Sequence, residues 1–261
     1  MKFSPLVFSA LLAVAPAAFA HSQVKPVEHK LSVGPNGNKT EMPVTVYPAK
    51  GRDLIVWLPS DNGLLPADAR IAAQLANAGV EVWAADAMGA RFLPVVPSSL
   101  EQIPAADIAD VVRAAKAKSG KRVYLLGPGR GAVPALSAAK LLQADKVPVL
   151  RGVVLISPNL YVGTPDAGEE AKYLPVAAQT RTRLYILQPE LSPWRWYLDR
   201  LSGQLKRGGS LVRIKTLPGV RDRFYYREDG PPAEQAMGKR MPQLILRALK
   251  DLKPLSSERL R

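Results

Sequence analysis

The pattern of hydrophobic and polar positions changes once along the chain, near residue 50. Before that point, two short stretches alternate apolar and polar residues, VEHKLSV (27–33) and EMPVTVY (41–47), and they flank the segment GPNGNKT. The Asn-Gly pair in this segment favours a tight turn, so the two stretches are predicted to form an antiparallel hairpin. From residue 53 onward, short apolar runs without alternation follow, which are typical of strands buried on both faces.

These apolar runs are separated by segments with helical periodicity. The predicted strands cover 53–59, 80–86, 122–127, 152–158, 183–189 and 210–217. The predicted helices lie near 67–78, 104–118, 132–143, 193–206 and 233–252, the last interrupted or kinked at Pro242. Alternating buried strands and helices predict an α/β domain with a mainly parallel central sheet, helices on both of its faces and the hairpin at one edge. Residues 159–180 have weak periodicity and are predicted to be an insertion or lid over the sheet.

The two ends of the chain differ from this pattern. Residues 1–20 begin with Lys2, continue with an apolar stretch and end in the small-x-small sequence AFA, which predicts a cleaved signal peptide and a periplasmic or secreted protein. Residues 21–254 are then predicted to form one α/β domain, and 255–261 a flexible tail. No segment after the signal approaches the roughly 18 uninterrupted apolar residues of a membrane-spanning helix, so no transmembrane span is expected after cleavage.

Positive charge is concentrated in the last third of the chain. The 261 residues carry a formal net charge of +14, and residues 181–261 hold 18 basic against 8 acidic side chains. This asymmetry favours attraction to an anionic small molecule, a lipid headgroup, an envelope polymer or an acidic protein, although a solvated surface would carry the same charges. No nucleic-acid motif is present, so no nucleic acid is expected as a partner. The chain has no cysteine, which excludes a thiol nucleophile and a cysteine-ligated metal site.

One motif links the predicted fold to chemistry. Residues 123–139, VYLLGPGRGAVPALSAA, run from an apolar strand through three glycines into a helix of small residues. The order of elements resembles the α/β-hydrolase superfamily over nearly the whole mature chain: DLIVWLPSDNG stands as the third strand with its oxyanion-type loop, and VYLLGPGRGA stands where the family has its nucleophile elbow, G-x-S-x-G. The stretch from Leu54 to Arg91 is also similar to VirJ-like periplasmic members. The resemblance implies the hydrolase fold and, for the family at large, hydrolytic activity.

The family's reactive residues are absent at the matching positions. Gly129 stands where the nucleophilic serine would be, and Arg221 lies in the loop after the last strand, where the family places its histidine. An arginine stays protonated and cannot serve as a general base, and a serine nucleophile needs such a base. Glu190 matches the acid position but has no histidine to orient. These positions predict a non-catalytic binding or accessory protein that has lost its triad; the alternative is an active, esterase-like hydrolase with a non-standard catalytic set.

The same cleft is a candidate site for an anion. Free N–H groups at the start of the helix 132–143 and nearby arginines would attract a carboxylate, phosphate or sulfate group. The candidate ligand-binding residues are Ser60, Asp61, Asn62, Gly129, Arg130, Arg221 and Arg223. Alternatively, these arginines point to solvent or pair with Asp222 and Glu190. Ser60 and Ser157 follow predicted strands but have no evident base, so both are interpreted as turn or cap residues.

Two cofactor hypotheses are weaker. The segment GPGRGA also matches the dinucleotide pattern G-x-G-x-x-A through Gly127, Gly129 and Ala132, but it follows a mid-sheet strand and the next strand ends without an acidic residue. Signal cleavage would expose His21 as the new N-terminus, which could bind copper together with His29; a disordered polar terminus is favoured over this site. We expect no cofactor.

Overall fold

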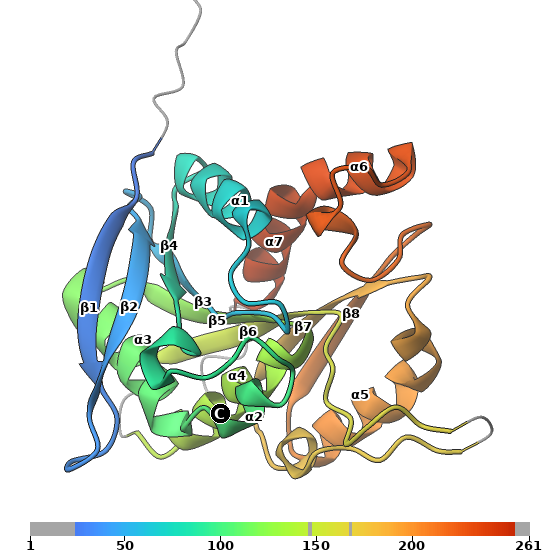
Figure 1. Cartoon of the computed structure of the whole chain (residues 1–261), viewed down its shortest axis with the longest axis horizontal. Helices are drawn as coiled ribbons and strands as arrows, with labels where there is room; N and C mark the ends of the chain where they lie inside the picture. Colours follow the sequence, from blue (N-terminus) through green and yellow to red (C-terminus); the bar gives the residue numbers. More distant parts are fainter. Residues whose placement is uncertain (1–23, 146–147, 167–168, 254–261) are drawn as a thin grey trace, which may run out of the picture.

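The computed structural model describes residues 24–145, 148–166 and 169–253. Its centre is an eight-stranded sheet in the order β1-β2-β4-β3-β5-β6-β7-β8 (Figure 1). The strands are β1 (Val27–Val33), β2 (Thr40–Tyr47), β3 (Asp53–Trp57), β4 (Val80–Ala85), β5 (Arg122–Pro128), β6 (Leu150–Ile156), β7 (Arg183–Pro189) and β8 (Leu211–Leu217). Strands β3 to β8 pair in parallel, which confirms the predicted fold class.

The predicted hairpin forms one edge of this sheet. β1 and β2 pair antiparallel, from Val27 opposite Val46 to Val33 opposite Thr40, and β2 continues antiparallel onto β4. Leu31 and Val33 are buried on either side of the exposed Ser32, as alternation predicts, whereas residues 27–30 are all exposed. The hairpin therefore attaches a two-stranded antiparallel edge to the parallel strands.

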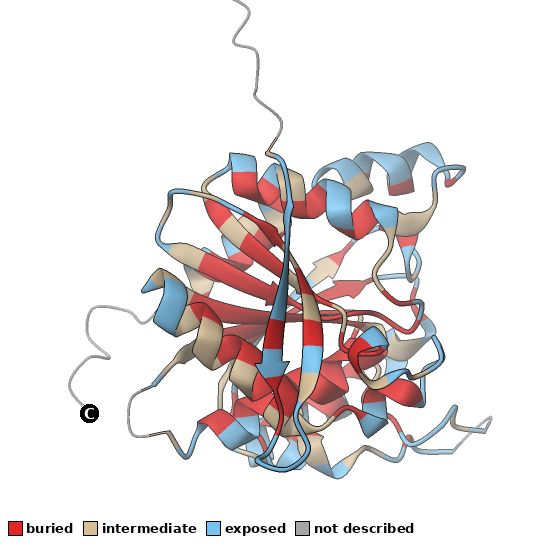
Figure 2. Ribbon diagram, turned by 60° about the vertical axis from the view of Figure 1, so that its left-hand side comes forward, coloured by how far each residue is buried: buried red, intermediate tan, exposed pale blue. Residues whose placement is uncertain are grey.

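Helices cover both faces of the sheet. One face carries α1 (Pro66–Asn77), α6 (Pro232–Lys239) and α7 (Met241–Asp251), and the other carries α2 (Ser99–Gln102), α3 (Ala105–Ser119), α4 (Ala132–Leu142) and α5 (Leu198–Arg207). The central strands are buried between these layers (Figure 2). Each face has its own apolar core, which explains why the central strands read as apolar runs without alternation.

Two predicted helices differ from the structure. The segment near 193–206 starts with a 3₁₀ turn over Pro193–Tyr197 and continues as α5. The predicted closing helix at 233–252 is two helices, α6 and α7, which meet at Arg240. Pro242 lies in the first turn of α7, where its missing N–H has no partner to lose, so the proline begins a helix instead of kinking one.

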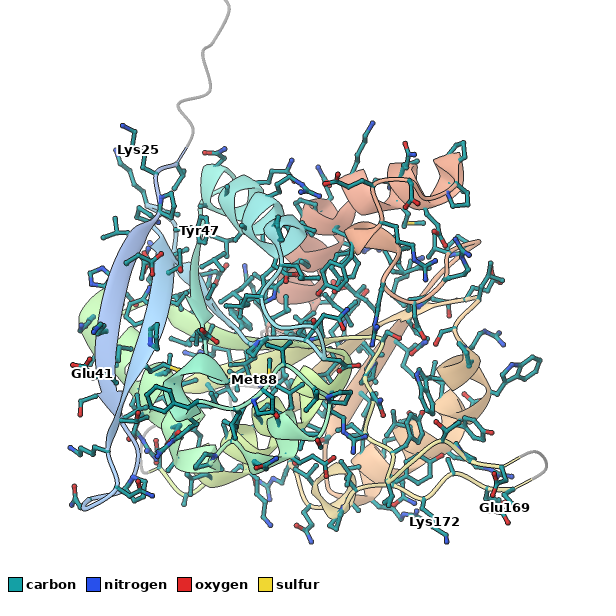
Figure 3. All side chains as sticks on the ribbon, viewed as in Figure 1. Lys25, Glu41, Tyr47, Met88, Glu169 and Lys172 are labelled. Atoms are coloured by element: carbon teal, nitrogen blue, oxygen red, sulfur yellow. The ribbon has the colours of Figure 1, made fainter. Side chains whose placement is uncertain are left out.

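The segment 159–180 contains little regular structure. It has a bridge between Tyr161 and Tyr173 and a 3₁₀ turn over Pro175–Ala178. Figure 3 labels Glu169 and Lys172 on its outer part, at the side of the molecule where α5 lies. Whether this segment is a lid stays a prediction.

The chain ends carry predictions of their own. The predicted signal peptide at 1–20 and the tail at 255–261 lie outside the described residues. None of the helices within 24–145, 148–166 and 169–253 combines the length and the apolar composition that crossing a membrane requires.

Candidate functional site

A cavity of about 440 Å³ opens where the parallel strands end. Its lining includes Ser60 and Asp61 after β3, Gly129 after β5, Ser157 after β6, and Asp222 and Arg223 after β8. The carboxyl ends of parallel strands meet at one edge of the sheet, so loops distant in sequence converge there. This cavity is the candidate active site.

The turn after β5 keeps the shape of a nucleophile elbow. β5 passes through a 3₁₀ turn, Gly129–Gly131, directly into α4, and Gly129 has a φ of 55°. A Cβ at Gly131 would lie 2.3 Å from the carbonyl oxygen of Pro59, and one at Gly127 would lie 2.6 Å from the carbonyl oxygen of Gly131. The flanking glycines are therefore required by close approach of the backbone. At the middle position the turn presents no reactive group.

Asp61 lies against this turn. One carboxylate oxygen, Oδ1, accepts a hydrogen bond from the backbone N–H of Arg130 at 2.6 Å, and the other, Oδ2, accepts one from the Arg223 guanidinium at 2.9 Å. A Cβ at Gly129 would lie 2.9 Å from Asp61 Oδ1. The carboxylate of Asp61 thus occupies the space that a side chain at position 129 would need.

Ser60 has the turn role expected of it. Its hydroxyl donates to the carbonyl oxygen of Gly63 at 3.1 Å and accepts the N–H of Asn62 at 3.2 Å. These bonds lie within a small hairpin-like turn in which Ser60 and Gly63 also exchange two backbone hydrogen bonds. Ser60 is buried and structurally engaged, so it closes the loop after β3.

Ser157 has a partner that the sequence did not reveal. Its backbone φ is 46°, in the left-handed region, and its hydroxyl donates to Asp222 Oδ1. Ser192, after β7, donates to the other oxygen, Asp222 Oδ2, at 2.9 Å. The interpretation of Ser157 as a turn or cap residue without a base is therefore corrected: the loop after β8 brings a carboxylate to it. A non-glycine residue held at positive φ is a mark of functional sites.

The predicted anion-binding arginines all have carboxylate partners. The Arg221 guanidinium donates two bonds to Glu234, at 2.8 and 3.0 Å, and Arg223 donates to Asp61. Arg130 is buried, and its guanidinium pairs with Glu101 of α2. These partners differ from the predicted ones, Asp222 and Glu190.

Glu190 and Glu234 have contrasting roles. The carboxylate of Glu190 accepts the backbone N–H of Gly219 at 2.9 Å, which ties two loops together, as expected of an acid without a histidine. Hydrogen bonds from Arg221 lower the pKa of Glu234 to about 2. Of the seven candidate ligand-binding residues, all of them described, Asn62 and Arg130 are absent from the cavity lining.

The buried carboxylic acid Asp68 contacts a tyrosine of the cavity lining. Tyr225 and Tyr226 line the cavity; the hydroxyl of Tyr225 donates to that of Tyr226 at 3.0 Å, and Tyr226 donates to Asp68 Oδ1 at 3.1 Å. Burial raises the pKa of Asp68 to about 6, against the opposing hydrogen bonds from Leu65 N–H and Tyr226. Burial also raises the pKa of both tyrosines. Sequence reasoning missed this group because its members lie some 160 residues apart.

The copper hypothesis can be examined at only one of its two residues. His29 is exposed on β1, and His21 lies outside the described residues. Within the ranges that the structure describes, no group of three or more histidine, aspartate and glutamate side chains is placed to hold a metal ion.

Several solved structures have a fold similar to that of this chain. Esterase Est22 superposes with a TM-score of 0.67 at 13% identity, covering 90% of this chain and 83% of its own. Carboxyl esterase 2 from the mycorrhizal fungus Tuber melanosporum superposes with a TM-score of 0.65 at 14% identity, covering 92% of this chain and 90% of its own. An esterase from Pyrobaculum calidifontis superposes with a TM-score of 0.61 at 13% identity, covering 89% of this chain and 88% of its own.

The chain has the α/β-hydrolase fold. No protein-family model matches the sequence. No curated protein matches it either. The similarity to VirJ-like members, the export of the protein and its anionic partners stay predictions.

The same comparison corrects the functional prediction. The neighbours are named as esterases and hydrolases, and nothing in the comparison supports a lost triad or a non-catalytic role. The prediction of a pseudoenzyme is therefore wrong, and its alternative, an active hydrolase with a non-standard catalytic set, is better supported. The sequence analysis relied on Gly129 and Arg221 at the family's reactive positions and found no evident base for Ser157; in the structure, the hydroxyl of Ser157 contacts the carboxylate of Asp222.

Proposed function

We propose that this chain is an esterase-like hydrolase in which Ser157 is the nucleophile and Asp222 is the general base. The observation that supports it most directly is the hydrogen bond from the Ser157 hydroxyl to Asp222, two residues that both line the candidate cavity. A serine hydroxyl is a weak nucleophile until an adjacent base takes its proton, and this contact supplies such a base.

The proposed reaction proceeds in two steps. Ser157 Oγ attacks the carbonyl carbon of an ester while Asp222 Oδ1 takes the hydroxyl proton. The C–O bond to the alcohol then breaks, and the leaving oxygen takes the proton back from Asp222, which leaves an acyl-enzyme. Water attacks the acyl carbon, gives a proton to Asp222 and releases the acid, and the proton returns to Ser157 Oγ.

The surrounding groups hold this pair in place. Ser192 binds the second oxygen of Asp222, so the carboxylate is held from both sides while Oδ1 faces Ser157. Ser192 is itself buried and caps the 3₁₀ turn over Pro193–Tyr197 by accepting the N–H of Trp194. Pro158 follows Ser157 and has no N–H, so the oxyanion donor that the family takes from the residue after its nucleophile has to come from elsewhere in the cleft.

The test combines covalent labelling with turnover. The purified chain is treated with a fluorophosphonate probe and assayed with p-nitrophenyl esters. Labelling at Ser157 is expected, together with turnover that Ser157→Ala reduces to background and that Asp222→Asn lowers by about 10²–10⁴-fold, the usual contribution of a general base.

Ser60→Ala is the matched control, because Ser60 lines the same cavity while its hydroxyl bonds to Gly63 and Asn62 of its own turn and to Tyr226. It should keep both labelling and turnover within a few fold of the unmodified chain. Turnover that survives Ser157→Ala, or a label on another serine, would overturn the assignment.

A further inference from the structure

The cleft contains a carboxylate that belongs to the protein itself. Asp61 is 8% exposed, and each of its oxygens accepts one hydrogen bond, from the Arg130 N–H and from the Arg223 guanidinium. One backbone donor and one guanidinium donor, each aimed at a different oxygen, form a set that suits a planar carboxylate. The contact with Asp61 therefore indicates that these two donors can bind a carboxylate.

The N–H of Arg130 does not depend on Asp61 for its position. The N–H of Arg130 is fixed by the turn Gly129–Gly131, and the guanidinium of Arg130 is anchored separately on Glu101. Arg223 has a left-handed backbone, with φ of 60°, and its side chain is 49% exposed. If Asp61 rotated away, the N–H of Arg130 would keep its position, and the half-exposed Arg223 would lose this ion pair and could pair with another carboxylate.

Closure of the loop after β3 does not explain Asp61. Ser60 and Gly63 already exchange two backbone hydrogen bonds, at 3.1 and 3.0 Å, and the Ser60 hydroxyl adds a third bond to Gly63. Gly129 has no side chain, which leaves the room that the carboxylate occupies. A side-chain rotation at Asp61 can thus vacate the donors without opening the turn.

We propose that Arg130 N–H and Arg223 form a carboxylate-binding subsite, that Asp61 is its resting occupant, and that a carboxylate on the substrate displaces Asp61. Asp61 and Arg223 line the same cavity as Ser157, so a carboxylate bound in place of Asp61 holds the rest of the molecule beside the proposed nucleophile. The substrate class is then a half-ester, a molecule with one free carboxylate and one ester group. This inference rests on the proposed function for turnover but not for binding.

Binding is tested without any reaction. The backbone amide signal of Arg130 is followed by ¹⁵N NMR during titration with succinate. In Asp61→Ala, we expect a saturable shift with a Kd at least about tenfold lower than in the unmodified chain, since a vacated pair of charge-assisted hydrogen bonds is worth a factor of this order. Adding Arg223→Gln should abolish the gain.

Two further variants make this result decisive. Asp86→Ala removes a carboxylate that also accepts a backbone N–H, that of Gly89, but lies outside the cavity lining, and it should leave the titration unchanged. Asp61→Asn keeps the size of the side chain and provides a second reading if the alanine variant unfolds. An Arg130 signal that succinate does not move in either Asp61 variant overturns the subsite.

Turnover then tests the substrate class. We expect Asp61→Ala to raise kcat/KM for monomethyl succinate about tenfold more than it changes kcat/KM for dimethyl succinate, since only the half-ester has a carboxylate for the subsite. If neither ester is hydrolysed while succinate still shifts the Arg130 signal, the proposed function fails and the subsite stands. Equal effects on the two esters would refute the half-ester assignment.

Discussion

Gly129 shows how one missing side chain can be explained by its surroundings. Its φ of 55° is the conformation that a nucleophile elbow requires, and a Cβ there would lie 2.9 Å from Asp61 Oδ1. Position 129 and Asp61 therefore compete for one space. A serine placed at this position would have to displace the carboxylate from its two donors.

This competition predicts that a serine at position 129 lowers the free energy of unfolding. Gly129→Ser should destabilise the chain by more than the roughly 1–2 kcal/mol of a left-handed non-glycine residue. Gly37→Ser is the matched control, since Gly37 has a φ of 88° but nothing within 4 Å of an added Cβ. Urea denaturation measures both variants. Equal losses would mean that Asp61 moves aside freely, and the hydroxyl introduced at position 129 would then have room to act as a second nucleophile.

The residues of the site were predictable only in part. The loop Ser60 to Asn62 and the glycines of the elbow follow from the order of strands and their turn residues. The pair Ser157 and Asp222 did not, because neither belongs to a motif and the positive φ of Ser157 is a property of the folded backbone. Their contact joins positions 65 residues apart, which periodicity cannot detect.

At the scale of elements, strands were easier to predict than helix breaks. Strands buried on both faces are apolar throughout, so the predicted β7 matches the structure from Arg183 to Pro189. The closing segment has an apolar stripe on both sides of Arg240, so its periodicity alone predicts one helix. The break between α6 and α7 falls at Arg240, two residues before Pro242, where the sequence predicts an interruption or kink.

The start of α6 is tied to the loop after β8, and this tie has a pH dependence. Glu234 is 2% exposed and accepts bonds from the backbone and side chain of Arg221, which hold its pKa near 2. A lowered carboxyl pKa stabilises the fold above its ordinary value of about 4.5, and this stabilisation is lost as pH falls toward 2.

Glu234→Gln should therefore lower Tm at pH 7 and remove part of the decrease in Tm between pH 4.5 and 2. Glu228→Gln is the control, because Glu228 is exposed and its pair with Arg70 spans 3.4 Å. Thermal scans across pH measure both. If the two variants have the same pH profile, the tie contributes no stability.

At the scale of the whole molecule, the sheet order determines where chemistry can occur. The fold class, the hairpin at one edge of the sheet and the position of the cleft were all predictable, because alternating buried strands and helices permit few arrangements. The loops that line the cleft were not, because their conformations depend on contacts such as Asp61 with Arg223 that form only after the sheet has brought them together.

The buried Asp68 makes global stability depend on pH in the opposite direction to Glu234. Burial raises its pKa from 3.8 to about 6, so the folded chain holds a proton that the unfolded chain releases. Stability should thus fall as pH rises from about 4 to 6, by up to about 3 kcal/mol from this group. Chemical denaturation of Asp68→Asn at several pH values measures it. The difference between variant and parent should grow over this interval, and a constant difference would exclude a raised pKa.

The bond between Ser157 and Asp222 spans the ends of β6 and β8, with β7 between them. The proposed nucleophile thus follows a strand inside the sheet, whereas its proposed base lies on the loop after the edge strand β8. Because edge strands fray before central ones, loosening of β8 would abolish turnover while most of the protein is still folded. On heating, ester turnover would then be lost several degrees below the global Tm, and its loss would report the local unfolding of β8.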